Sequence, residues 1–474
     1  MTVATLGDVI RPGTTRGLDF VTLDELTKRT GINPDSILKF ALGVMLCNAL
    51  DKDSTEIGID VQVEGDFYRL EVADDGGKKL SLKEIKLILD FENKASSKRG
   101  FLRVSRGYLG NALKSIFGYS YVLAESKGLT PPDITVKTGN RQYRIVLKPD
   151  RIKEVIESEI ATTKREDDDF TTFIVKFPKD VITSQQFQRP HSSSPSVLDL
   201  VFATSIVNPT RKISYNLFNI EEGTLGKPQE GKAIRQETSV LWYTQKQFQS
   251  LYEDFVRVTP EAQLKEFIPL FRGFTSKKLI GEILQKLNSG NHDSGRNSTV
   301  QFFPATAIKD LPKEGVAKLF AAIRARAKPV AKRSIPSVLG VVGEKSFESL
   351  REQNGWERLK YVMLPGIQVE CPTCLGSNIS GYTSPCRSQD HVEFPYLIEL
   401  AIFDRKNDDK EGLKVYQCVN FMASMEEIFS SRIFDINYRL GRVGISKDMP
   451  FTVVAHLVCP VLKWLNYGKS GLDE

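Results

Sequence analysis

The hydrophobic pattern of residues 1 to about 225 predicts helices followed by strands. Apolar residues recurring every three or four positions predict helices over 23–31 and 33–53, and Asn33 or Asp35 can cap the second. Alternating apolar and polar residues then predict half-buried antiparallel strands. These strands are expected at 57–65, 67–75, 133–140, 142–149 and 171–178. Helices followed by a meandering sheet are typical of an α+β sandwich.

The pattern changes twice further along the chain. From about 240 to 333 it predicts helices, which are expected at 244–258, 261–273, 275–290 and 313–327. After a boundary at 328–336, one helix is expected at 348–359, and strands are expected at 396–405, 413–422 and 450–460. The pattern therefore predicts an α+β multidomain protein, with domains at residues 1–235, 236–335 and 336–474.

Composition agrees with a large folded protein. At about 150 residues per domain, 474 residues correspond to about three domains. With 41% apolar and 26% charged residues, the chain can form packed cores and is not globally disordered. Six cysteines are too few for a disulfide framework. No apolar run reaches the length of about 18 residues that a membrane helix needs, so we expect a cytoplasmic protein with no membrane partner.

Positive charge gathers in the middle of the chain. The net charge is +6, and Pro260 to Pro336 carries fourteen Lys and Arg against six Asp and Glu. A patch that faces DNA has this distribution, and so does an ordinary solvated helical face. If DNA binds here, salt-sensitive and sequence-tolerant phosphate contacts are expected. The residues predicted to make them are Lys277, Lys278, Arg324, Arg326, Lys332 and Arg333.

Two segments of the first domain carry groups suited to a nucleotide. Asn48 and Asp51, three residues apart, project from one face of the predicted helix. An Asn oxygen on that face can bind Mg²⁺, which shares its remaining ligands with water and phosphates. Asp74 ends a strand and is followed by Gly76 and Gly77. A buried carboxylate there can accept a hydrogen bond from an adenine amino group.

A third segment carries glycines immediately before a helix. Gly107 and Gly110 would let backbone N–H groups approach phosphates, and the helix N-terminus adds a favourable dipole. The segment contributes Gly107, Tyr108, Leu109, Gly110, Asn111 and Lys114 to the predicted site. Each of the three segments alone is also typical of an ordinary turn or cap. Their order and spacing make them a candidate site.

Together these motifs resemble the ATP site of the GHKL family, which includes gyrase, heat-shock chaperones, MutL and histidine kinases. LCNALD resembles the helix motif of the family, VADDGG its strand and turn, and RGYLGNALK its glycine-rich lid. The strand TTFIVKFP resembles the one that carries the family's threonine, here Thr171. The resemblance implies an α/β sandwich of the Bergerat type, with ATP and Mg²⁺ as cofactors.

The resemblance extends beyond the motifs and is strongest to the B subunit of type IIB topoisomerases, topoisomerase VI. Residues 202–216 resemble the strand that closes the ATPase domain, and 261–284 resemble the helix-two-turns-helix module. Residues 335–344 resemble the start of the transducer domain, which has a ribosomal-protein-like α/β fold. Lys469 resembles the transducer lysine that reaches the γ-phosphate of ATP, although an exposed turn lysine would look the same.

Three positions depart from the family pattern. The family's general base, a glutamate four residues before Asn48, is Val44 here. An aliphatic side chain accepts no proton, so hydrolysis should be slower by about 10²-fold or more. Ala112 replaces a lid glycine, and Lys78 replaces a turn glycine. Lys78 is either an added phosphate contact or an exposed loop lysine. We expect nucleotide binding with weak or absent turnover, and a degenerate site that no longer binds ATP is the alternative.

The resemblance implies an ATP-gated DNA clamp that forms a homodimer through its ATPase domain and associates with the nucleoid. Strand cleavage would come from a separate subunit resembling topoisomerase VI A. A second hypothesis is a non-catalytic, nucleotide-dependent DNA-binding or scaffold protein, which would suit defence against foreign DNA. A chaperone-like or MORC-like ATPase is a third.

A cysteine cluster near the C-terminal part suggests a metal. Cys371, Cys374, Cys386 and His391 form the pattern C-x2-C-x11-C-x4-H. Thiolates and an imidazole at this spacing can form a tetrahedral structural zinc site, and reduced surface cysteines are the alternative. The histidines show no pairing with Ser or Cys that would indicate a nucleophilic triad.

Overall fold

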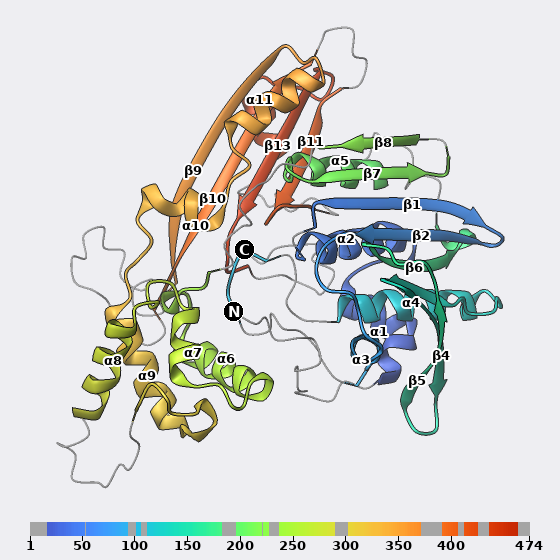
Figure 1. Cartoon of the computed structure of the whole chain (residues 1–474). Helices are drawn as coiled ribbons and strands as arrows, with labels where there is room; N and C mark the ends of the chain where they lie inside the picture. Colours follow the sequence, from blue (N-terminus) through green and yellow to red (C-terminus); the bar gives the residue numbers. More distant parts are fainter. Residues whose placement is uncertain are drawn as a thin grey trace.

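Two β-sheets with their helices, and a group of helices that lies between them in the sequence, form the fold (Figure 1). The α+β architecture is therefore confirmed. The structure is a computed structural model that describes residues 17–52, 54–92, 101–105, 111–182, 196–219, 221–226, 237–289, 302–370, 391–405, 412–424 and 436–462.

The first sheet has eight strands in the order β5-β4-β3-β6-β2-β1-β7-β8. Its neighbouring strands are antiparallel, apart from the parallel pair β1 and β7. Alternate residues of β1, namely Ile57, Ile59 and Val61, are buried on one face, as the sequence pattern predicts. The strands are β1 Glu56–Glu64, β2 Phe67–Asp74, β3 Ile134–Thr138, β4 Arg141–Asp150, β5 Val155–Lys164, β6 Thr171–Pro178, β7 Lys212–Leu217 and β8 Glu221–Leu225.

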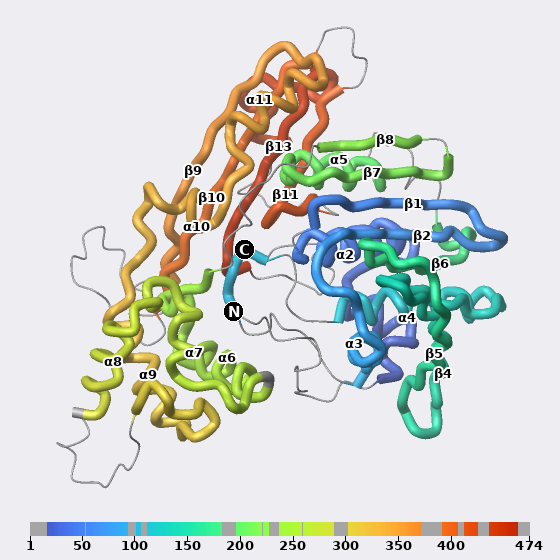
Figure 2. Tube along the Cα trace, viewed as in Figure 1, coloured from blue at the N-terminus to red at the C-terminus, as the bar shows by residue number. Residues whose placement is uncertain are grey.

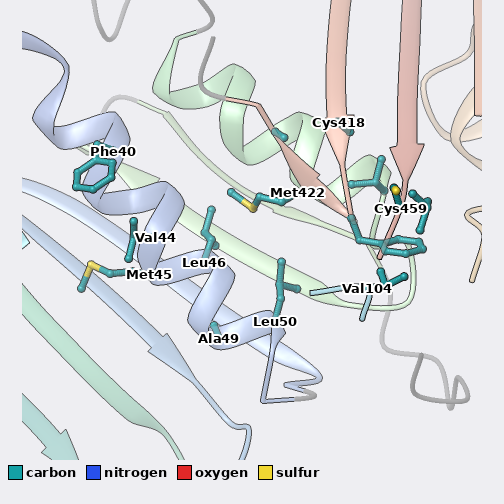
Figure 3. Packing of buried hydrophobic residues seen from close by; sticks show 14 of the residues in the cluster. Phe40, Val44, Met45, Leu46, Ala49, Leu50, Val104, Cys418, Met422 and Cys459 are labelled. Atoms are coloured by element: carbon teal, nitrogen blue, oxygen red, sulfur yellow. The ribbon is translucent and has the colours of Figure 1, made fainter. Parts of the chain in front are cut away.

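Helices cover the buried face of this sheet. They are α1 Leu23–Thr30, α2 Ile37–Leu50, α3 Leu82–Ile88, α4 Ala112–Ser126 and α5 Val197–Ile206. Helix α2 is apolar around its whole circumference and is buried almost throughout, because it packs on the sheet and on α4 and α5. Figure 3 shows Leu46 of α2 facing Met422 of the second sheet, whereas Met45 lies on the opposite side of the helix.

The segment 202–216, expected as one strand, is a helix end followed by a strand. A capping box between Ser196 and Asp199 starts α5, which runs to Ile206. Pro209, shortly after this helix, cannot continue it, and β7 begins only at Lys212. The expected strand is therefore wrong in its first half, because a capped and mostly apolar segment forms a buried helix.

A group of helices follows the first sheet, as predicted. These elements are η6 Val240–Trp242, α6 Gln245–Val258, α7 Leu264–Phe267, α8 Lys277–Ser289, α9 Lys313–Arg326 and α10 Ile335–Leu339. Their core is aromatic, with ring centroids 4.9 Å apart for Phe248 and Phe320 and 5.4 Å apart for Phe267 and Phe271. Helix α7 is shorter than predicted, since the chain tightens into a 3-10 turn at Pro269.

The second sheet has five strands in the order β12-β11-β13-β10-β9. Helices α10 and α11 pack on β10 and β9, respectively. The strand β9 was not predicted: its burial does not alternate, and the predicted helix over 348–359 ends at Gln353. The elements are α11 Glu344–Gln353, β9 Arg358–Glu370, β10 Val392–Asp404, β11 Lys414–Val419, β12 Met422–Ala423, α13 Ile436–Arg442 and β13 Phe451–Val458.

The two sheets meet at α5 and at the turn between β11 and β12. Helix α5 packs on β7 of the first sheet and on β11 and β12 of the second, and Figure 2 shows β11 beside α5. In the turn, Asn420 Nδ2 donates to the carbonyl oxygens of Ser105 at 3.2 Å and Cys459 at 2.9 Å. Asn208, after α5, donates to the Phe421 carbonyl at 2.7 Å. Hydrogen bonds thus join both sheets to this one turn.

Among the described residues, no helix combines the length and apolar character needed to cross a bilayer.

Candidate functional site

Asp74 lies at the end of β2, in the middle of the first sheet. It is 3% exposed, and the strand register places Ile57 of β1 on one side and Thr171 of β6 on the other. The Thr171 hydroxyl is 3.0 Å from that of Thr138 on β3, and both threonines are buried. The sheet therefore brings Asp74 and Thr171, two predicted site residues, into direct cross-strand proximity.

The Asp74 carboxylate joins the end of β2 to the end of α2. Its Oδ2 accepts a hydrogen bond from Lys52 Nζ at 2.8 Å, and its Oδ1 accepts one from the Gly76 N–H at 3.2 Å. The Ser54 hydroxyl lies 3.3 Å from Oδ1 and 2.6 Å from the Ala49 carbonyl. Because a hydroxyl has one proton, the shorter contact is its donor bond.

The two glycines after Asp74 are required by the backbone. A Cβ on Gly76 would lie 2.5 Å from Ser54 Oγ and 2.9 Å from the Lys52 carbonyl oxygen. Gly77 has a φ of +75°, which favours glycine. Asp75 fixes the same turn by accepting the Thr55 N–H at 2.7 Å. Close packing against Lys52 and Ser54 therefore explains Gly76, and the left-handed φ explains Gly77, without any phosphate contact.

Asn48 and Asp51 are polar residues at the C-terminal end of α2, whereas Lys39 near its start is buried. Val44 is 9% exposed and lies near Phe40 in the apolar cluster (Figure 3). Asn48 is half-buried, and its side chain makes no hydrogen bond with other residues in the described ranges. Asp51 is the C-cap residue. The amide of Asn48 is therefore placed where a ligand could use it, whereas Val44 is part of the core.

The glycine-rich segment of the predicted site lies outside the described residues. Gly107, Tyr108, Leu109 and Gly110 belong to it, and Lys469 is also outside. Helix α4, which follows the segment, packs on α2 and β6. Helix α4 itself therefore lies next to the elements that carry Asn48 and Thr171, and the convergence of all three segments stays a prediction.

Two other predicted site residues, at the start of α4, are buried within the fold. Asn111 occupies the N-cap position and is 6% exposed. Lys114 is 1% exposed, and its Nζ donates to the Asp90 carbonyl. A buried ammonium must have such a partner, so Lys114 has a contact within the fold, and its predicted phosphate contact stays a prediction.

Arg103 is a cation near the site that the sequence reasoning missed. It is half-buried, with its guanidinium 5.5 Å from the centre of the Phe101 ring. Burial lowers the pKa of Arg103, against the opposing effect of the Asp51 and Tyr243 charges. Its Nε has no hydrogen-bond partner within the described part of the chain. The basic residues around Gly100 and Gly107 were the signal that could have indicated it.

The six predicted DNA contacts divide into two kinds. Arg324 is half-buried and donates to the Tyr243 carbonyl at 3.0 Å and to the His391 carbonyl. These bonds tie α9 to η6 and to the start of β10, so Arg324 has a role in the fold, and its predicted DNA contact stays a prediction. The exposed members are Lys277, Lys278, Arg326, Lys332 and Arg333.

The predicted zinc ligands lie mostly outside the described residues. This holds for Cys371, Cys374 and Cys386, so the zinc site stays a prediction. His391 Nε2 is 2.9 Å from Glu393 Oε1. Within the described ranges, no group of three His, Cys, Asp or Glu side chains could hold a metal ion. The other three cysteines, Cys47, Cys418 and Cys459, are reduced and at least half-buried, as the apolar pattern around them predicts.

Comparisons with known proteins give only distant likenesses. No protein-family model and no curated protein matches the chain. The chain is similar to the B subunit of DNA gyrase from Myxococcus xanthus, with 9% identity over 94% of this chain and 87% of that one, at a TM-score of 0.36. It is also similar to the topoisomerase IV ATP-binding domain of Francisella tularensis, with 12% identity over 95% of this chain and 85% of that one, at a TM-score of 0.34. Likenesses of this size establish neither a shared family nor a shared function.

Proposed function

We propose that this chain binds ATP beside Asp74, in a site of the GHKL type. The observation that carries the proposal is the pairing of Asp74 with Thr171 at buried strand ends, with the end of α2 bonded to the same carboxylate. Asp74 would accept a hydrogen bond from the adenine amino group, and Asn48 would be a ligand of Mg²⁺. The metal would neutralise charge on the phosphates, which would face the segment 107–110.

Turnover is expected to be slow or absent. Val44 stands where the family resemblance expects a general base, and it is packed in the apolar cluster. The position cannot accept a proton, so the attacking water would lack its usual activation. Occupancy of the site, more than hydrolysis, would then carry the signal.

The role of that signal is proposed from the resemblance to topoisomerase VI B. The proposed domains are 1–235 for ATP binding, 236–335 for DNA contact and 336–474 as a transducer. ATP would close a homodimeric clamp around DNA, and a separate A-like subunit would supply cleavage. Five exposed basic residues of the helical group and its C-terminal flank support DNA contact. A non-catalytic DNA-binding or scaffold protein is the second candidate, which the apolar surroundings of Val44 favour.

A nucleotide titration tests this proposal. Purified wild-type protein and Asp74→Ala are titrated with ATP and a non-hydrolysable analogue in the presence of Mg²⁺, and affinity, dimerisation and phosphate release are recorded. We expect the wild type to bind both nucleotides and Asp74→Ala to bind each of them about 100-fold more weakly. We expect phosphate release to equal that of the Asp74→Ala control. If the wild type binds neither nucleotide, the proposal is wrong. Phosphate release well above that of the control would show that the protein hydrolyses ATP, and would exclude a signal carried by occupancy of the site alone.

The clamp itself needs a separate experiment with DNA. Retention of closed-circular DNA, compared with the linear form, is measured with and without the analogue. A clamp should retain the circular form in high salt only when nucleotide is bound. DNA binding that does not respond to nucleotide would contradict the clamp and leave only the binding or scaffold protein.

A further inference from the structure

Lys52 reaches from the end of α2 to the buried carboxylate of the candidate site. Its backbone N–H donates to the Ala49 carbonyl at 3.1 Å, so the residue directly follows the helix. Its side-chain stem lies over Gly77, 3.5 to 3.6 Å from where a Cβ would be. Its Nζ is 2.8 Å from Asp74 Oδ2 and 5.9 Å from the centre of the Phe173 ring. Lys52 therefore covers the glycine turn and contacts two neighbouring strands.

Lys52 is hydrogen-bonded to the oxygen of Asp74 that has fewer other donors beside it. Oδ1 already accepts the Gly76 N–H, and the Ser54 hydroxyl lies beside it. Oδ2 accepts from Lys52. A carboxylate oxygen can accept more than one hydrogen bond, but a donor that approaches Oδ2 from the glycine turn meets the Lys52 ammonium and its stem over Gly77. A base amino group and the Lys52 ammonium would compete for the same atom.

We infer that Lys52 is a resident competitor of the nucleotide base, which must displace its ammonium from Asp74 for the ligand to bind. The inference rests on the proposed function, because it assigns regulation to that same site. The two partners differ in burial: the Lys52 side chain is 28% exposed, and that of Asp74 is 5% exposed. The carboxylate is fixed in the sheet, whereas the long lysine side chain can swing into water and recover its hydration. The lysine is therefore the partner that yields, and it sets the affinity of the site.

Removing the competitor should tighten binding. Lys52→Met keeps a stem of similar length over Gly77 and removes the donor to Asp74. Because a charge-assisted hydrogen bond no longer has to be broken, the Kd for ATP should fall by about tenfold. The variant also leaves Asp74 buried without its cation, so without nucleotide it should melt earlier than the wild type. The stabilisation on adding ATP should accordingly be larger than in the wild type.

A matched control and a double variant separate this effect from general electrostatics. Lys83→Met removes the same charge from an exposed position on α3 and should leave the Kd unchanged. Lys52→Met combined with Asp74→Ala should bind ATP no better than Asp74→Ala alone, because no carboxylate is left to compete for. Lys52→Gln, a smaller disturbance, should give an intermediate gain and decides the question if Lys52→Met does not fold.

The outcomes separate this inference from the proposed function. Tighter binding in Lys52→Met and an unchanged Lys83→Met support the competitor. Unchanged or weaker ATP binding in Lys52→Met, with a wild type that binds, overturns the competitor and makes Lys52 neutral or a ligand contact. If the wild type, Lys52→Met and Lys52→Gln are all folded and none of them binds ATP, the proposed nucleotide site itself is wrong.

Discussion

Among the described residues, each sheet of this protein encloses one carboxylate, and the two are held in different ways. Glu399, on β10 of the second sheet, has no exposed surface. Its partners are all parts of the folded core: the N–H groups of Val342 at 3.0 Å and Gly343 at 2.8 Å, the hydroxyl of Tyr361 at 2.8 Å, and Nδ1 of His456 at 3.0 Å. Nε2 of the same histidine accepts the Phe421 N–H at 3.1 Å, so the proton of the ring is on Nδ1, which donates a hydrogen bond to Glu399.

Asp74 is almost as deeply buried but depends on a partner that can leave. Its cation, Lys52, is partly in water, whereas every partner of Glu399 is fixed by backbone or by packing. The same contrast holds among the cations, since Arg324 is bonded inside the fold and Lys277 is exposed. An enclosed charge with fixed partners serves stability, and a charge with a movable partner, or none, is placed to meet a ligand.

The largest expected effect is on stability, after removal of the enclosed carboxylate. Glu399→Ala strands His456 and the donors around it, so the free energy of unfolding should fall by about 3 kcal/mol or more. Asp74→Ala should cost only about 1 kcal/mol, because Lys52 can return to water. Denaturant unfolding of both variants measures the difference. A larger loss for Asp74→Ala would contradict the comparison.

Ligand affinity should show the opposite order. Asp74→Ala should weaken ATP binding by about 100-fold, because the base loses its acceptor in a desolvated site. Glu399→Gln, which keeps the size and some hydrogen bonds of the original, should bind ATP with unchanged affinity. Calorimetric titration of the two variants at one pH is the measurement. Equal losses in both would mean that neither carboxylate meets the base directly.

Acid should lower the stability of the fold by protonating Glu399, the enclosed carboxylate. Burial alone would raise the pKa of Glu399, but the hydrogen bonds that it accepts from His456 and from the N–H groups of Val342 and Gly343 lower it overall. A lowered pKa stabilises the fold above the ordinary Glu value of about 4.3, and this stabilisation is lost as pH falls through the lowered value. Stability should therefore decline below about pH 4.3. Glu399→Gln should show a shallower decline across the same acid range, and an equally steep one would exclude this cause.

The smallest expected effect concerns the exposed cations. Lys277→Ala with Lys278→Ala should reduce the slope of log affinity for DNA against log salt by about 2, one for each phosphate that the protein no longer neutralises. Lys127→Ala with Arg141→Ala, two exposed cations on the first sheet and its helices, is the matched control and should leave the slope unchanged. Equal slopes in both pairs would show that the helical group has no special role.

Most of the fold follows from local periodicity. The alternation over 57–65 and 67–75 and the helical spacing over 244–258 and 313–327 each gave an element with nearly the predicted bounds. The strand β9 did not follow, because Val362, Met363 and Leu364 are consecutive and all partly exposed on an edge strand. Helix α5 was missed because a helix buried on all sides has no polar face to set its period.

The site was predictable only in part. The placement of Asp74 at a strand end followed from alternation, whereas its pairing with Thr171 needed the resemblance or the sheet order. The Lys52 contact could not be read from the sequence, because it depends on where α2 stops relative to the turn after β2. Lys114 and Arg324 looked like surface cations and are bonded inside the fold, which depends on contacts between distant segments.

The double hydrogen bond of Asn420 has a mechanical consequence. One side-chain amide holds both Cys459, at the end of β13, and Ser105, two residues before the first predicted lid glycine. Any rotation of the second sheet must therefore pull the chain at Ser105 along with it or break that bond. The chain at Ser105 is thus anchored to a turn of the other sheet, so a change in the angle between the sheets acts directly on this point of the chain.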